Sequence, residues 1–157
     1  MARGVSKKEK SFAIAIIVAI VLVGSLLLFL IPSPEQVVGT SDDGLVHMEG
    51  VSRVADGFVI KRIDDAELSV AELVGPMYEV SVLGGGSVQD VEVVFSVEEF
   101  ETPDVTLQNM VVYEFDHTSL TWKPLPTLFH LSDHTVFSSM SVSGSTLVGL
   151  GVRVQAE

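Results

Sequence analysis

Two histidines late in the chain, His130 and His134, have the spacing that zinc-binding histidines adopt on a helix. In an extended chain the same step would place them about 13 Å apart, which is too far for one ion. A turn over Leu131-Ser132-Asp133 would bring them together. We predict an exposed loop here with no metal ligands, and a zinc site stays the alternative.

Acidic side chains form a second group with metal-binding chemistry. Calcium takes about six to eight oxygen ligands from a folded loop, and carboxylates can supply them. The candidates are Asp42, Asp43, Asp64, Asp65, Glu98, Glu99, Glu101 and Asp104. No Asp-x-Asp-x-Asp-Gly run occurs in the sequence, so calcium also stays an alternative. The acidic segment around Phe100, together with Phe129, could instead contact a partner protein or form a solvated loop.

Glycine and serine residues raise the questions of phosphate binding and nucleophilic catalysis. Gly84-Gly85-Gly86-Ser87 would hold a phosphate only at the start of a helix, and we expect a strand after it. No Gly-x-Ser-x-Gly elbow is present. A Ser–His–Asp set could assemble in space from His47 or His117, but no spacing selects one. We therefore expect no enzymatic activity and predict no catalytic, cofactor-binding or metal-binding residues.

The longest apolar segment of the chain is Phe12–Ile31, which contains no charged residue. At about 1.5 Å per residue, a helix of this length spans about 30 Å, the thickness of the hydrocarbon core of a bilayer. Pro32 and Pro34 end it, because proline cannot continue a helix. We predict one N-terminal transmembrane helix over residues 12–31.

Positive residues set the expected orientation of this helix. Arg3, Lys7, Lys8 and Lys10 all precede the apolar segment, so residues 1–11 should be a cytoplasmic tail and the following chain extracytoplasmic. A cleaved signal peptide is the alternative. The apolar run is longer than the usual 7–15 residues or so of such a peptide, and Ile31-Pro32-Ser33-Pro34 makes a poor cleavage site.

The chain beyond the apolar segment is strongly acidic. Its five basic and twenty acidic residues give it a net charge of −15, within a total of −12. Such a surface repels nucleic acid and anionic lipid, and it suits cations, basic partners or high salt. The chain has no cysteine, which fits a bacterial or archaeal surface better than a disulfide-rich eukaryotic one.

Valine-rich runs separated by Gly, Pro, Asp and Ser predict an all-β fold, an antiparallel β-sandwich over residues 45–157 that follows a linker over residues 32–44. The strands are expected at Leu45–Met48, Val51–Val54, Phe58–Ile63, Met77–Leu83, Val91–Val97, Met110–Phe115, Leu120–Lys123, Thr135–Val142 and Thr146–Val154. Ala66–Leu73 fits a strand or a short helix. Hairpin turns are predicted at residues 84–86, 116–119 and 143–145.

Gly75–Gly149 resembles the ZU5-like β-sandwich segments of large prokaryotic surface proteins. The resemblance lies in Gly75-Pro76-Met77-Tyr78-Glu79-Val80, Val91–Phe95, Val112-Tyr113-Glu114-Phe115-Asp116, Thr121-Trp122-Lys123-Pro124-Leu125-Pro126-Thr127 and Phe137-Ser138-Ser139-Met140-Ser141-Val142. It implies that these runs form adjacent strands. On size alone, Trp122 is expected to fill the core beside Tyr113 and Phe137.

These observations predict a membrane-anchored, non-enzymatic cell-surface protein. Its partners would be the membrane, through a single span, and another envelope or surface protein that the sandwich binds or positions. Nucleic acid is not expected as a partner, and no cofactor is expected. The alternatives are a pilin-like filament subunit, an accessory subunit of an archaellum-like apparatus, and a metal-dependent or serine hydrolase.

Overall fold

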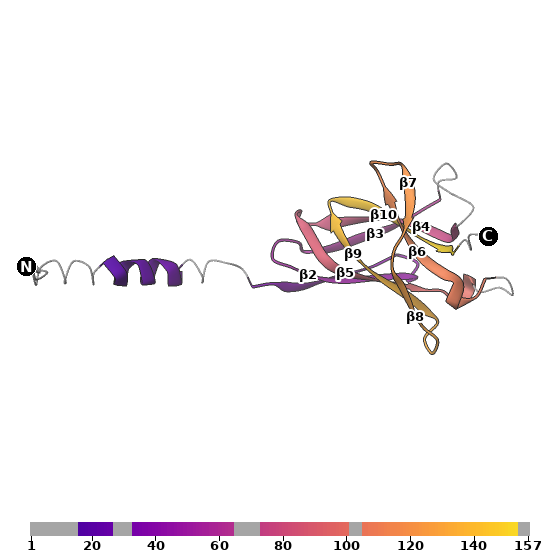
Figure 1. The fold of residues 1–157 in the computed structure, drawn as a ribbon, viewed down its shortest axis with the longest axis horizontal. Coiled ribbons are helices and arrows are strands. Elements are labelled where there is room, and N and C mark those ends of the chain that lie inside the picture. Colours follow the sequence, from indigo (N-terminus) through magenta and orange to yellow (C-terminus); the bar gives the residue numbers. More distant parts are fainter. Residues whose placement is uncertain (1–15, 27–32, 65–72, 101–104, 154–157) are drawn as a thin grey trace, which may run out of the picture. The chain divides into compact units, whose positions relative to one another are not determined.

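Alternating apolar and polar residues build two antiparallel sheets that pack as the two layers of a sandwich (Figure 1). The computed structural model describes residues 16–26, 33–64, 73–100 and 105–153. Within these ranges the sandwich contains ten strands, divided equally between the sheets. The predicted all-β antiparallel sandwich is therefore confirmed.

Each sheet combines strands that lie far apart in the sequence. Sheet A has the order β1 (Glu35–Thr40), β2 (Val46–Ser52), β5 (Ser87–Ser96), β9 (Thr135–Ser143), β8 (Thr127–His130). Sheet B has the order β3 (Gly57–Ile63), β4 (Leu73–Leu83), β10 (Ser145–Val152), β6 (Met110–Asp116), β7 (Thr121–Pro124). Two short 3-10 helices, η1 (Glu98–Phe100) and η2 (Leu107–Asn109), lie between β5 and β6.

The core lies between the sheets and consists mainly of valine with a few larger side chains. Val46 and Met48 of β2 are fully buried, while the residues between and after them are exposed. Tyr78 and Phe95 are the two largest fully buried side chains, and their rings meet edge to face at 5.9 Å. Each such side chain contributes about 1.5–3 kcal/mol through burial.

Only one of the three predicted hairpins is a hairpin. Residues 116–119 join β6 to β7, which pair with each other as expected. The turn at residues 84–86 instead leads from β4 in sheet B to β5 in sheet A, and residue 144 leads from β9 in sheet A to β10 in sheet B. The glycines in these two turns have positive φ. This conformation suits a tight turn within one sheet and a tight turn between sheets equally well, so it does not determine which strand pairs with which.

The predicted linker over residues 32–44 is wrong at residues 35–40, which form β1 and pair with β2. Only Val37 in this strand is buried, so the alternation was too weak to recognise. The strand β8 was also missed, and the two strands predicted at 45–48 and 51–54 overlap the two ends of the single strand β2. The ambiguous segment at residues 66–73 lies outside the described residues, except Leu73 at the start of β4.

The expected position of Trp122 in the core is also wrong. Its cross-strand neighbour is Phe115, with ring centroids 5.4 Å apart. The core-facing residues of β6 are Met110 and Val112, so Phe115 and Trp122 lie on the outer side of sheet B, where Trp122 is half-buried. Phe137 belongs to sheet A and does not meet Trp122 in the core. The large side chain of Trp122 suggested that it would be buried, but its size could not indicate which side of sheet B it lies on.

Residues 16–26 form a helix with exposed apolar side chains. The two ends of the predicted transmembrane segment, residues 12–15 and 27–31, lie outside the described residues, as does the tail at 1–11. In the part of the chain that the structure describes, no helix is both long and apolar enough to cross a membrane.

A glycine in β1 allows one side of the sandwich to close. A Cβ atom at Gly39 would lie 2.7 Å from the Cβ of Phe58 in β3 and 2.8 Å from the carbonyl oxygen of Phe58. We expect Gly39→Ala to lower the free energy of unfolding by about 1–3 kcal/mol, because backbone would have to move. Chemical denaturation measures this. Val38→Ala, at a half-exposed neighbour, is the control and should change stability little. Equal stability of both variants would show that β1 and β3 do not need this close contact.

Candidate functional site

The turn between β8 and β9 brings the two candidate zinc histidines to opposite ends of a short loop. The His130 ring lies edge to face on Phe137, with centroids 5.0 Å apart, and its Nδ1 is 4.0 Å from a carboxylate oxygen of Asp133. His134 has a positive φ of 47°. Within the described ranges, no group of three or more histidine, aspartate and glutamate side chains could hold a metal ion.

The other two histidines lie far apart in the fold, His47 in β2 of sheet A and His117 in the turn between β6 and β7 of sheet B. His47, on the outer side of sheet A, shares a hydrogen bond of 2.9 Å with the Thr40 hydroxyl. His117 packs edge to face on Phe115, with centroids 5.1 Å apart, beside a surface cavity of about 340 Å³ that serines of β9 and β10 also line. Within the described residues neither histidine is hydrogen-bonded to a serine.

The carboxylate of Asp116, the residue before His117, already has partners. Asp116 forms an ion pair with Lys123 and accepts hydrogen bonds from the backbone N–H groups of Thr118 and Ser119. The Lys123 contact, helped by these N–H groups, holds the pKa of Asp116 well below its usual range. Asp116 therefore stays ionised and positions the β6–β7 turn, and the arrangement is not that of a Ser–His–Asp relay.

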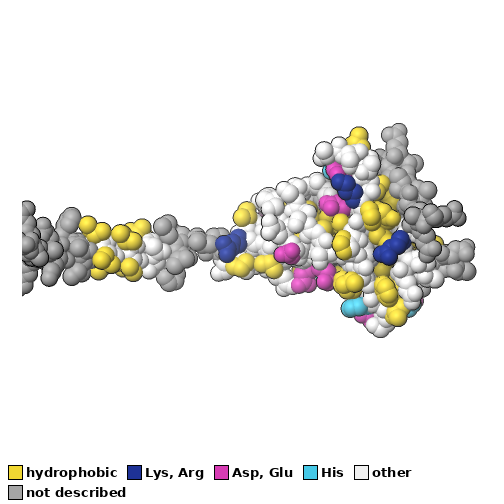
Figure 2. Space-filling model, viewed as in Figure 1, with side chains coloured by type: hydrophobic (Ala, Val, Ile, Leu, Met, Phe, Trp, Pro, Cys, Tyr) yellow, Lys and Arg dark blue, Asp and Glu magenta, His cyan; other side chains and the backbone are white. Residues whose placement is uncertain are grey.

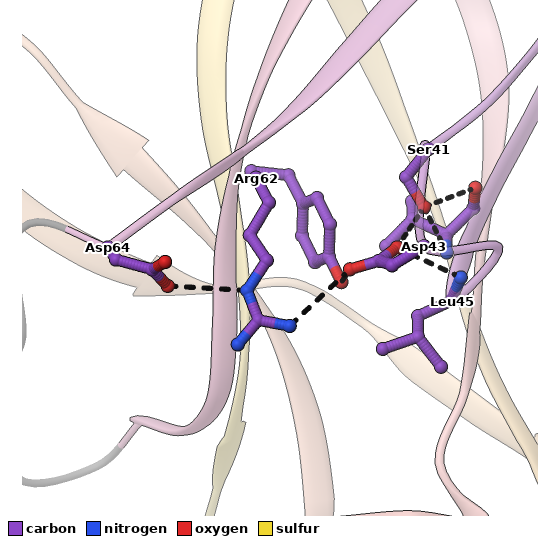
Figure 3. A network of polar contacts seen from close by, with 7 residues as sticks. Ser41, Asp43, Leu45, Arg62 and Asp64 are labelled. Carbon is purple, nitrogen blue, oxygen red and sulfur yellow. Dashed lines mark hydrogen bonds and ion pairs between the residues drawn. The ribbon is translucent and has the colours of Figure 1, made fainter.

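Two of the candidate calcium carboxylates surround an arginine (Figure 3). Arg62 on β3 lies 3.6 Å from Asp43 and 3.2 Å from Asp64. Asp43 also accepts hydrogen bonds from the Ser41 hydroxyl at 2.6 Å, the Leu45 N–H at 3.1 Å and the Tyr78 hydroxyl at 2.8 Å. The guanidinium group thus supplies the positive charge between these carboxylates.

These contacts also fix the charge of Asp43. Partial burial raises the pKa of Asp43. The hydrogen bonds from Ser41, Leu45 and Tyr78 and the nearby Arg62 lower it, and their combined effect is larger, so the pKa falls below the usual value of 3.8. Burial, followed by the hydrogen bond to Asp43, raises the pKa of Tyr78. Of the other candidates, Glu98 and Glu99 lie in η1, while Asp65, Glu101 and Asp104 lie outside the described residues.

Charge is distributed unequally between the two sheets. The strands of sheet B carry three basic and three acidic side chains, and Lys61 and Lys123 lie directly opposite Glu79 and Glu114. The strands of sheet A carry Glu35, Glu49, Asp90 and Glu92 but no lysine or arginine. This separation by sheet was invisible in the sequence, because it depends on the strand order.

The outer side of sheet A, which we call the acidic face, presents carboxylates beside apolar side chains. Glu49 lies directly opposite Glu92 in the register of β2 and β5. The next row crosses the sheet through Thr40, His47, Val94, Phe137 and Leu128. Figure 2 shows acidic side chains gathered along the lower side of the domain, where Figure 1 places β2 and β5. The acidic face is the candidate functional site.

The strand β8 forms one edge of this face and exposes large apolar side chains. Leu128 is 63% exposed and Phe129 is 42% exposed, and Leu131 in the adjoining turn is 62% exposed. The hairpin of β8 and β9 projects from the body of the domain (Figure 1). Of these three side chains, the sequence predicts only Phe129 as a loop residue that could contact a partner. A signal for this strand is present in the sequence, since the short run Thr127–His130 lies between Pro126 and a turn.

None of the protein families, curated proteins and solved structures compared with the chain matches it. The resemblance of Gly75–Gly149 to ZU5-like segments therefore stays a prediction. The candidate site rests on the geometry of the acidic face and of β8.

The pKa of Asp43 predicts how stability depends on pH. Because folding lowers this pKa, the ionised carboxylate stabilises the fold above its usual value of 3.8, and this contribution is lost as pH falls through the lower, folded value. We expect Asp43→Asn to lower the free energy of unfolding by about 1–3 kcal/mol near neutral pH, with a smaller difference from wild type below about pH 3. Denaturant titrations across this range measure the difference, and the exposed Asp42→Asn is the control. A difference that does not depend on pH would contradict this role.

Proposed function

We propose that the protein is a membrane-anchored, non-enzymatic cell-surface protein whose acidic face binds and positions another envelope protein. A single helix over residues 12–31 would cross the membrane with residues 1–11 in the cytoplasm. The sandwich would then lie outside the cell. The uncharged segment Phe12–Ile31 and the positive residues before it support this orientation.

The observation that carries the proposed binding is the separation of charge between the sheets. Two glutamates directly opposite each other cost about 0.2–1 kcal/mol, and Glu49 and Glu92 have no basic side chain on their sheet to offset this. Gln36 donates a hydrogen bond of 2.6 Å to Glu49, which leaves the negative charge in place. A partner with lysine or arginine would turn this repulsion into attraction.

The position of β1 supports binding close to the membrane. Because β1 begins at Glu35, only residues 32–34 separate the apolar segment from the sandwich. Three residues reach about 10 Å, whereas the expected linker would have reached about 40 Å. A partner of this domain would therefore itself be an envelope protein that approaches the bilayer.

The membrane orientation predicts a specific pattern of extraction and proteolysis. We expect the full chain to leave the membrane fraction only with detergent, because its apolar segment would be buried in lipid. Protease added outside intact cells should degrade residues 35–153, and an epitope tag at the N-terminus should survive. Immunoblotting of both ends measures this. A domain that stays protected until the cells are lysed would reverse the orientation.

The binding role predicts a carboxylate-to-lysine cross-link on the acidic face. Carbodiimide treatment of membranes should couple the protein to an envelope partner, because this reagent joins carboxylates to amines in direct contact. Glu49→Gln with Glu92→Gln should reduce the product by about tenfold, if each charge contributes about 0.7 kcal/mol. The control, Glu98→Gln with Glu99→Gln, removes the same charge from η1 and should leave the product unchanged. Equal loss in both variants would show that only the net charge matters.

A further inference from the structure

The edges of the two sheets differ in how well they are protected. β1 and β3 approach each other closely through Gly39 and Phe58 on one side of the sandwich. β3 carries Lys61 and Arg62, and β7 carries Lys123 and Pro124. Charges and proline on an edge strand discourage the addition of another strand. Among the edge strands of the described residues, β8 alone has neither a charged residue nor a proline.

The side chains of β8 would also contact an added strand. Leu128 points to the same side of sheet A as Phe137, its cross-strand neighbour, and both lie in the row that contains Val94. Phe129 lies on the other side of the strand, opposite Val136. An added strand could therefore form main-chain hydrogen bonds along one edge and apolar contacts on both sides.

We infer that β8 accepts an extended segment of the partner protein, which continues sheet A by one strand and carries basic side chains on the outer side. This inference rests on the proposed function and names the form of the partner. The charge that a basic segment would meet here comes from Asp133, an exposed carboxylate next to β8, and from the net charge of −15 that the chain carries beyond its apolar segment. A second copy of this chain suits the site poorly, since each copy carries −15 beyond its apolar segment.

A synthetic peptide tests strand addition directly. The probe is acetyl-Lys-Val-Lys-Val-Lys-Val-Lys-amide, titrated by calorimetry into the full chain in neutral detergent micelles. A second probe has the same sequence with alternate backbone nitrogens methylated, which prevents pairing along one edge. A third has glutamate in place of lysine. We expect the first probe to bind at least about tenfold more tightly than the other two.

Two matched variants locate the binding. Leu128→Lys should weaken binding of the first probe by about tenfold, because it places a charge on the edge and removes an apolar contact. Leu120→Lys makes the same change at a leucine that is 73% exposed in the β6–β7 turn, and it should leave binding unchanged. Equal binding to both variants, or equal binding of the methylated probe, would overturn strand addition at β8.

Two further measurements separate this inference from its rivals. A concentration-dependent dimer in sedimentation, lost in Leu128→Lys, would show that a second copy is the occupant and would overturn the inference. A carbodiimide product that forms equally in wild type and Leu128→Lys membranes would keep the proposed function and reject β8 as its binding edge. The lack of any product in wild type would reject the proposed function itself.

Discussion

Tyr78 connects the two sheets through both ends of its side chain. Its ring, on β4 of sheet B, packs edge to face against Phe95 of sheet A, and its hydroxyl donates a 2.8 Å hydrogen bond to Asp43 in the turn between β1 and β2. Asp43 in turn lies beside Arg62 of β3. Tyr78, which is fully buried, thus fixes the packing of the sheets and the position of the hairpin of β1 and β2. This hairpin forms part of sheet A, whose outer side is the acidic face.

Strong local patterns predicted the fold well, and relations between strands could not be predicted. The apolar runs in residues 91–95 and 110–115 identified two strands of the sandwich, and Asp116 identified the only correct hairpin among the three predicted. The glycine turn at residues 84–86 has the same local chemistry as a hairpin turn, although its strands enter different sheets. Local sequence determines where the chain turns, while packing of the inner faces determines which strands become neighbours.

The candidate site shows the same limit more clearly. The acidic composition suited cations, basic partners or high salt, and only the strand order shows that Glu49 and Glu92 face each other on a sheet whose described strands carry no lysine or arginine. Two of the acidic residues that had seemed suited to calcium, Asp43 and Asp64, instead contact Arg62. Leu128 was overlooked because a short strand with little alternation resembles a loop.

The place of β10 in sheet B has a consequence for how the domain is made. This strand lies between β4 and β6, although it follows all other strands of the sandwich in the chain. During synthesis, β4 and β6 cannot be joined until residues 145–152 have emerged. Sheet B is therefore completed only after its last strand has been made, and the valine-rich inner faces of the sandwich need protection from aggregation until then.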